Sequence, residues 1–281
     1  MALLVVVSLL WAFSFGLIKR FLGGVDSTLV AALRLALSLI VFLPFLRLKG
    51  LRPGTAWRLA GIGGLQFGVM YLAYIESFRH LRAYEAALFT ITTPVFVVLF
   101  ADVMERRWRP MALAAAVVAI AGTAVVVARS SELRVTLAGL LLVQLSNAAF
   151  AAGQVFYRRL RLAEPALRDR NVFALLYAGG ATVAAAALGL RTPSLALTTP
   201  QWLTLIYLGV GASGVGFFLW NVGATKVAPA TLAVMNNAKV PLGVTASIVV
   251  FGETADLTGL VSGFVLLGAA LWLAARDERA A

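Results

Sequence analysis

Apolar runs of membrane-spanning length recur along the whole chain, and short stretches with charges, proline or glycine separate them. A helix needs about 20 mostly apolar residues to cross the hydrocarbon core of a bilayer. Division at the polar stretches predicts an all-α integral membrane protein with ten transmembrane helices. Their expected ranges are 2–18, 28–47, 56–79, 83–100, 111–128, 135–157, 171–189, 201–222, 230–251 and 257–275.

Composition agrees with a multi-pass membrane protein. The chain has 281 residues, of which 61% are hydrophobic and 13% charged; a soluble domain has about 25% charged residues. The first apolar segment lacks a basic start, and Lys19 and Arg20 follow it in place of a small-residue cleavage site. We therefore expect a retained helix rather than a signal peptide. Arginine far outnumbers lysine, as in GC-rich bacterial genomes, so we expect a bacterial inner membrane.

The net charge of +12 lies in short clusters between apolar runs. Fifteen lysines and arginines fall after even-numbered helices or at the C-terminus, and seven fall after odd-numbered helices. The positive-inside rule then places both termini in the cytoplasm. The clusters form no continuous basic surface, so we expect no nucleic-acid partner. With no cysteine and one histidine, His80, we expect no metal site and no cofactor.

The two halves of the chain resemble each other. A shift of 147 residues aligns 77–96 with 224–243 and superposes Pro94 on Pro241, while residues 11–20 match 150–159. This predicts two five-helix copies, residues 1–130 and 131–281. Because five is odd, the second copy enters the membrane from the opposite face. Inverted repeats of this kind are characteristic of secondary transporters, whose substrate site lies near the midplane.

With this pattern the whole chain resembles the drug/metabolite transporter superfamily, of the EamA type. The matching features are Trp11 with Lys19, Arg34 within AALRLALSLI, Pro94 followed by Glu105, and Pro241 followed by Gly252-Glu253. Met104-Glu105 departs from the family's usual Gly-Glu. The resemblance implies a transporter whose cavity is lined mainly by helices 1, 3, 4, 6, 8 and 9; the segments outside the spans are too short for a soluble domain.

Lys239 is the clearest candidate for binding chemistry. It lies about ten residues, or ~15 Å, from either end of its predicted helix, beyond the reach of a snorkelling side chain. A charge at that depth costs ~2.5–3.5 kcal/mol and usually faces a cavity or a partner. The carboxylates within the predicted spans are Glu76, near the outer end of its helix, and Glu85, near the start of the next. We expect Lys239 to bind an anionic group of the substrate, with a structural ion pair as the alternative.

Other polar and aromatic residues on the expected lining helices complete the predicted site. The substrate-binding set is Lys239, Asn236, Asn237, Trp11, Phe15, Tyr71, Tyr74, Thr90, Thr93, Phe150, Gln154 and Trp220. Gating or coupling roles are predicted for Pro94, Pro241, Glu76 and Arg34. The alternatives are helix packing for the hydroxyls and amides, a core or belt position for the aromatic residues, and pairing of Arg34 with Asp26 or a loop carbonyl.

These observations predict a secondary transporter, not an enzyme, that moves a small carboxylate-bearing metabolite by alternating access. An amino acid is the preferred solute, with export implied by the resemblance and proton coupling as a hypothesis. The alternatives are an exchanger of phosphorylated metabolites and an intramembrane serine protease, suggested by GxSG at 211–214 with His80 as base. The partners expected are the solute and the lipid bilayer, and the GxxxG pattern at 259–263 suggests a homodimer.

Overall fold

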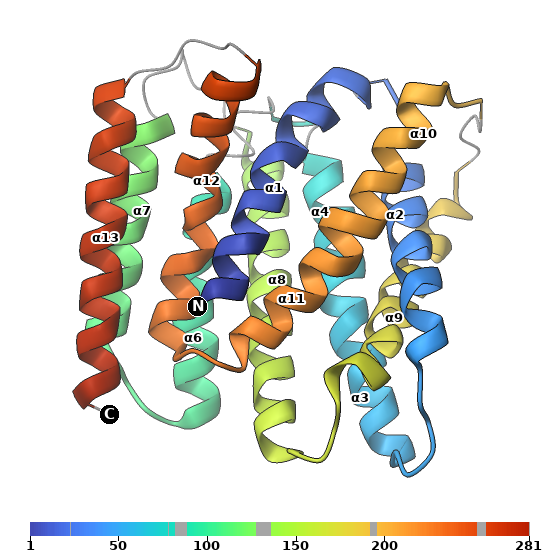
Figure 1. Ribbon diagram of the computed structural model, residues 1–281, viewed down its shortest axis with the longest axis horizontal. Coiled ribbons are helices and arrows are strands. Elements are labelled where there is room, and N and C mark those ends of the chain that lie inside the picture. Colours follow the sequence, from blue (N-terminus) through green and yellow to red (C-terminus); the bar gives the residue numbers. More distant parts are fainter. Residues whose placement is uncertain are drawn as a thin grey trace.

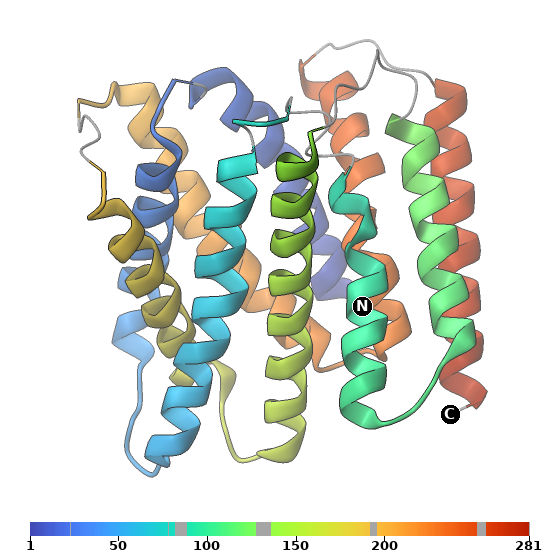
Figure 2. The ribbon, with the colours of Figure 1, turned by 180° about the vertical axis from the view of Figure 1, so that it is seen from behind.

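The computed structural model describes residues 1–22, 24–77, 79–81, 89–127, 136–191, 196–251 and 257–280, and every regular element in these ranges is helical (Figures 1 and 2). The elements of the first half are α1 (Ala2–Phe21), α2 (Ser27–Phe42), η1 (Leu43–Phe45), α3 (Pro53–Gly63), η2 (Gly64–Val69), α4 (Met70–Ser77), η3 (Thr90–Thr92), α6 (Thr93–Glu105) and α7 (Pro110–Val127). Those of the second half are α8 (Leu137–Ala163), α9 (Asp169–Leu188), α10 (Thr199–Ile206), η4 (Tyr207–Val215), α11 (Gly216–Ala224), α12 (Pro229–Phe251) and α13 (Leu257–Ala280).

The helices follow the predicted order, which confirms the all-α fold class. Six helices of the described part are long and apolar enough to cross a membrane, and Ala2–Ser14 and Pro110–Val125 are shorter apolar helices. Three helices extend well past their expected ends, because α6 continues to Glu105, α8 to Ala163 and α13 to Ala280. Asp102 therefore also lies within a helix. Residues 83–88 of the predicted fourth helix lie outside the described residues.

The two halves run through the bundle in opposite directions. One end of the bundle, which we call the basic end, holds four loops and the end of α13 (Figure 1). The loops are 46–52, 106–109, 164–168 and 225–228. The first helix of the first half, α1, runs away from the basic end, whereas the first helix of the second half, α8, runs toward it. This is the inverted arrangement that the odd number of helices per copy requires.

A stretch of π-helix interrupts the same helix of each half. η2 lies between α3 and α4, and η4 lies between α10 and α11. The shift of 147 residues places 64–69 on 211–216, which overlaps η4. A π-turn widens the helix and turns the side chains that follow it, and such turns are frequent at functional sites. In each half the π-turn therefore changes the direction of the side chains that follow it. These side chains belong to α4 and α11, which reach the centre of the bundle.

Glycines allow close approach of helices in the bundle. A Cβ atom at Gly63 would lie 1.9 Å from the carbonyl oxygen of Leu176, and one at Gly179 would lie 1.9 Å from that of Ala60. The contact between α3 and α9 is therefore backbone against backbone. Since lipid is as apolar as the side chains, this close packing is a main source of helix association in a membrane.

Gly179→Ala should destabilise the protein by about 1–3 kcal/mol, because the new methyl group forces α3 and α9 apart. Gly61→Ala is the matched control, since a Cβ atom there meets nothing within 4 Å. Thermal unfolding of both purified variants measures the difference. Equal midpoints for the two variants would show that the α3–α9 contact does not limit stability.

The inverted arrangement also predicts a specific topology. Reporters fused after Gly50 and after Leu162 should be active in the cytoplasm, and one fused after Gly189 should be periplasmic. A reporter at the C-terminus should be cytoplasmic. A periplasmic C-terminus would contradict the orientation inferred from the distribution of charges.

Candidate functional site

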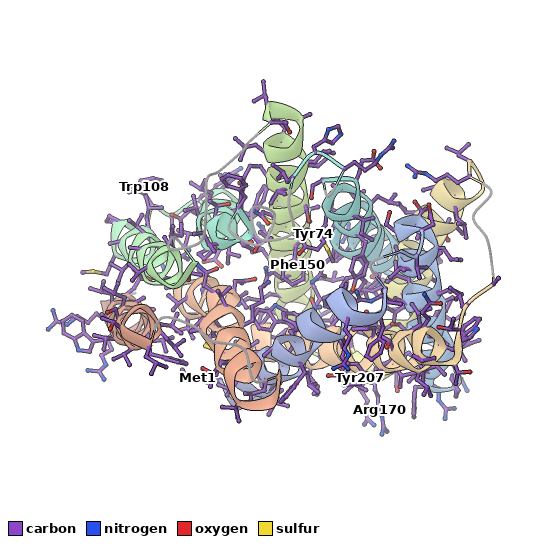
Figure 3. All side chains as sticks on the ribbon, turned by 90° about the horizontal axis from the view of Figure 1, so that it is seen from above. Met1, Tyr74, Trp108, Phe150, Arg170 and Tyr207 are labelled. Atoms are coloured by element: carbon purple, nitrogen blue, oxygen red, sulfur yellow. The ribbon has the colours of Figure 1, made fainter. Side chains whose placement is uncertain are left out.

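Lys239 lies against an aromatic cluster at the centre of the bundle. Its Nζ atom is 5.5 Å from the ring centroid of Trp11 in α1 and 5.9 Å from that of Phe150 in α8. Trp11 in turn packs against Phe217 at 5.5 Å and Trp220 at 4.9 Å, both in α11. We call Trp11, Phe150, Phe217 and Trp220 the aromatic cluster. Figure 3, seen along the bundle, places Phe150 and Tyr74 near the middle.

The ammonium of Lys239 has no acidic partner in the part of the chain that the structure describes; the ion pairs there involve other cations. Ring faces attract a cation but satisfy none of its three donors. Lys239 is half-buried, and its ammonium lies beside the rings of Trp11 and Phe150. Such a group can form an ion pair with a carboxylate or phosphate that enters the bundle.

A buried amide network holds one wall of the aromatic cluster in place. The Trp220 indole N–H donates to Gln154 Oε1 at 2.8 Å, and the amides of Gln154 and Asn236 bond each other at 3.3 Å. Asn236 also donates to the carbonyl of Leu232 at 2.8 Å. Gln154 and Asn236 are almost fully buried and bonded to protein atoms. Their amide groups position Trp220, and the contact of Gln154 and Asn236 with substrate stays a prediction.

Hydroxyl and amide groups connect η3 to α8 and to α12. Thr92 Oγ1 donates to Gln144 Oε1 at 2.7 Å and accepts from Asn147 Nδ2 at 2.9 Å. Asn237 Nδ2 donates to the Ile91 carbonyl at 2.9 Å, which ties α12 to η3. Thr92 and Gln144 are half-buried, like Lys239. The predicted substrate-binding set contains Thr90 and Thr93, and of the three threonines it is Thr92 that bonds α8 through Gln144 and Asn147.

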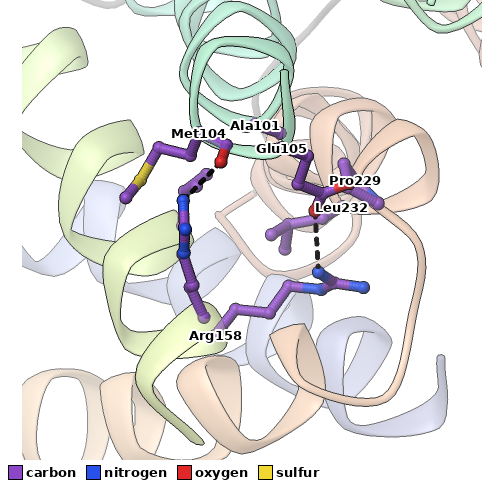
Figure 4. Close-up of a pocket in the computed structure, with 8 residues that line it drawn as sticks. Ala101, Met104, Glu105, Arg158, Pro229 and Leu232 are labelled. Carbon is purple, nitrogen blue, oxygen red and sulfur yellow. Dashed lines mark hydrogen bonds and ion pairs between the residues drawn. The ribbon is translucent and has the colours of Figure 1, made fainter. Parts of the chain in front are cut away.

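The bundle is closed below Lys239, toward the basic end. Residues 230–238 of α12 are all buried. Near the end of α6, Glu105 pairs with Arg158 of α8 at 3.4 Å and also with Arg109, while Arg159 donates to the carbonyl of Met104 (Figure 4). The cavity left between α6, α8 and α12 is about 10 Å³, room for about one water molecule. The described side chains between Lys239 and the basic end therefore pack closely.

Arg34 forms a second cationic centre inside the bundle. Its Nε atom donates to Ser213 Oγ at 3.0 Å, and its guanidinium lies 4.7 Å from the Tyr71 ring centroid. The Tyr71 hydroxyl also bonds Ser213 Oγ at 3.0 Å. The expected pairing of Arg34 with Asp26 is wrong, because Asp26 instead caps α2 by accepting from the backbone of residues 28 and 29. Arg34 joins α2 to η4 behind the aromatic cluster.

Several predicted residues lie elsewhere or are used differently. The carboxylate of Glu76 pairs with Arg79 at 2.8 Å and Arg191 at 3.1 Å, at the end of the bundle opposite the basic end. Pro94 lies in the first turn of α6, after η3, whereas Pro241 lies inside α12. Thr93 donates to the carbonyl of Thr90. The coupling and gating roles of Glu76, Arg34 and the two prolines stay predictions, and the side chain of Phe15 lies outside what the structure describes.

Two motifs from the sequence take structural roles. The Ser213 hydroxyl of the GxSG motif contacts Arg34 and Tyr71, so the structure does not form a dyad with the exposed His80. A Cβ atom at Gly122 of α7 would lie 3.2 Å from the carbonyl oxygen of Gly263. This end of the 259–263 pattern thus packs within the chain, and the homodimer stays a prediction.

Comparisons with known proteins agree with this architecture. The chain is 40% identical to the biotin transporter of Salmonella typhimurium, over 97% of this chain and 92% of that protein. It is 41% identical to the probable biotin transporter of Pseudomonas aeruginosa, over 100% of both chains. It is 28% identical to the aromatic amino acid exporter YddG of Ancylobacter novellus, over 77% of this chain and 74% of that one.

A solved crystal structure has the same fold, with a TM-score of 0.79 over 97% of this chain and 95% of that chain, at 24% identity. The model of the EamA-like transporter family matches residues 1–128 and again residues 137–275. This double match agrees with the two copies inferred from the sequence. The chain is a multi-pass membrane protein and small-molecule transporter that belongs to the EamA-like transporter family.

Proposed function

We propose that this transporter carries a small carboxylate-bearing solute and that the carboxylate pairs with Lys239. The observation that carries the proposal is the position of the Lys239 ammonium, over two aromatic rings and without a described acidic partner. An ion lifted out of water is costly until a counter-ion joins it. A solute that brings its own carboxylate would supply that counter-ion.

Biotin is the solute that we favour, because it combines a carboxylate with an apolar ring system and a polar ureido group. The rings of Trp11 and Phe150 beside Lys239 can pack against an apolar body. Thr92 and Gln144 are half-buried and bond each other, and their hydroxyl and amide groups would exchange that bond for one to a polar end of the solute. Two relatives at 40–41% identity are named as biotin transporters, and this supports the same choice.

An aromatic amino acid is the second candidate. It too has a carboxylate and an apolar ring, and the relative from Ancylobacter novellus is named as an exporter of such solutes. That relative is less similar than the biotin transporters, at 28% identity. The direction of transport, export in our sequence-based expectation, stays a prediction.

Lys239→Met should bind the transported solute roughly 30- to 150-fold more weakly, the effect of losing about 2–3 kcal/mol from a desolvated ion pair. Counterflow of labelled biotin and labelled aromatic amino acids into proteoliposomes measures the apparent affinity and identifies the solute. The variant should fold, because it removes a costly charge from the interior.

Lys226→Met is the matched control, since it loses the same charge in an exposed loop between α11 and α12. It should transport within about twofold of the wild type, because surface charges away from the site contribute little. Normal transport by Lys239→Met would remove the basis of the proposed carboxylate contact. Counterflow of aromatic amino acids alone would exclude biotin.

A further inference from the structure

A cavity lined by four cations lies at the basic end, far from Lys239 in the fold. Its volume is about 540 Å³, within the range of ligand pockets. Two loops form it: Arg47 and Lys49 come from the loop after α2, and Arg168 and Arg170 flank the start of α9. The backbone N–H of Arg47 donates to the carbonyl of Asn171 at 2.9 Å, which joins the two loops. We call this cavity the basic pocket.

The acids next to the basic pocket are already engaged elsewhere. Asp169 lies between two of the cations in sequence, but its carboxylate accepts from Arg161 at 2.6 Å and from Tyr157 at 2.5 Å. Glu164 accepts from Thr55 at 3.0 Å. None of the ion pairs among the described residues includes a cation of the basic pocket. The pocket therefore presents four positive charges without a described counter-ion.

The loop after α6, at the same end of the bundle, contains a cation that is paired with acidic residues. In the loop after α6, Arg109 pairs with Asp102 at 2.8 Å and also with Glu105. Basic residues at this end of the bundle thus form ion pairs where acidic residues lie near them. In the basic pocket the two neighbouring acids face away, and the four cations converge on one cavity.

The basic pocket lies where two membrane spans end. One candidate span ends at Phe45, which lines the pocket, and another begins at Asp169, between Arg168 and Arg170. Leu43 and Phe45 expose about half of their surface at this level, 54% and 49%. Cations at the end of a span, next to exposed apolar side chains, match an amphiphile with an anionic head and apolar tails.

We propose that the basic pocket binds the phosphate group of an anionic phospholipid. The guanidinium groups of Arg47, Arg168 and Arg170 would donate to phosphate oxygens, and Lys49 would add a point charge. Leu43 and Phe45 would contact the part of the acyl chains nearest the headgroup. Such a lipid would link the α2–α3 loop to the α8–α9 loop, which belong to different halves of the transporter.

Native mass spectrometry of the full-length protein, titrated with phosphatidylglycerol or with phosphatidylcholine, tests the proposal. The wild type should bind phosphatidylglycerol more tightly. The variant Arg168→Gln/Arg170→Gln should lose roughly 30-fold in that affinity, as expected for two cations near an anionic headgroup. The control Arg106→Gln/Arg107→Gln removes two exposed charges from the loop after α6, at the same end, and should change it less than about threefold.

Three results would overturn the proposal. One is equal binding of the two lipids by the wild type, and another is an equal loss in the two double variants, which would indicate nonspecific attraction. The third is displacement of phosphatidylglycerol by millimolar inorganic phosphate, which would indicate a soluble anion instead of a lipid. Unchanged elution and unfolding midpoints of both variants establish that they are folded.

Discussion

The charge of Lys239 inside an apolar bundle is the constraint around which the centre of this protein is built. A lysine at the middle of a membrane helix costs ~2.5–3.5 kcal/mol, and the faces of Trp11 and Phe150 offset part of that cost. The rings are themselves held: the Trp11 indole N–H donates to the carbonyl of Ala212 at 2.8 Å. Further bonds fix the neighbouring Trp220 through Gln154 and Asn236. The result is a rigid aromatic wall with one cation on it.

The resemblance between the two halves explains why side chains from both of them meet at the centre of the bundle. Divergence between the halves explains why one contributes a charged side chain and the other a polar one. Trp11 and Phe150 occupy matching positions in the two copies, and their rings meet at 6.1 Å. The shift of 147 residues superposes Lys239 on Thr92, so one copy supplies an ammonium where the other supplies a hydroxyl. A scaffold of two similar halves thus places unlike side chains at matching positions.

Local features of the fold could be predicted from the sequence, and contacts between distant helices could not. The length of each apolar run and the Pro94–Pro241 repeat can be read directly from the sequence. They predicted the helices and their inverted order. The partner of Asn236 is 82 residues away and that of Trp11 is 201 residues away, and nothing in either helix specifies them. The turns η2, η3 and η4 change which side chains face the centre. The partner of Arg34, Ser213 in η4, lies 179 residues away and was not among the predicted partners.

The most direct test of the central claim compares binding of biotin with binding of biotin amide, in which the carboxylate is replaced by an uncharged group. Isothermal titration of wild type and Lys239→Met with both compounds gives the coupling between the ammonium and the carboxylate. The account predicts that wild type prefers biotin by roughly 30-fold or more and that Lys239→Met binds both compounds equally. An undiminished preference for biotin in Lys239→Met would contradict it, because the carboxylate would then be recognised elsewhere.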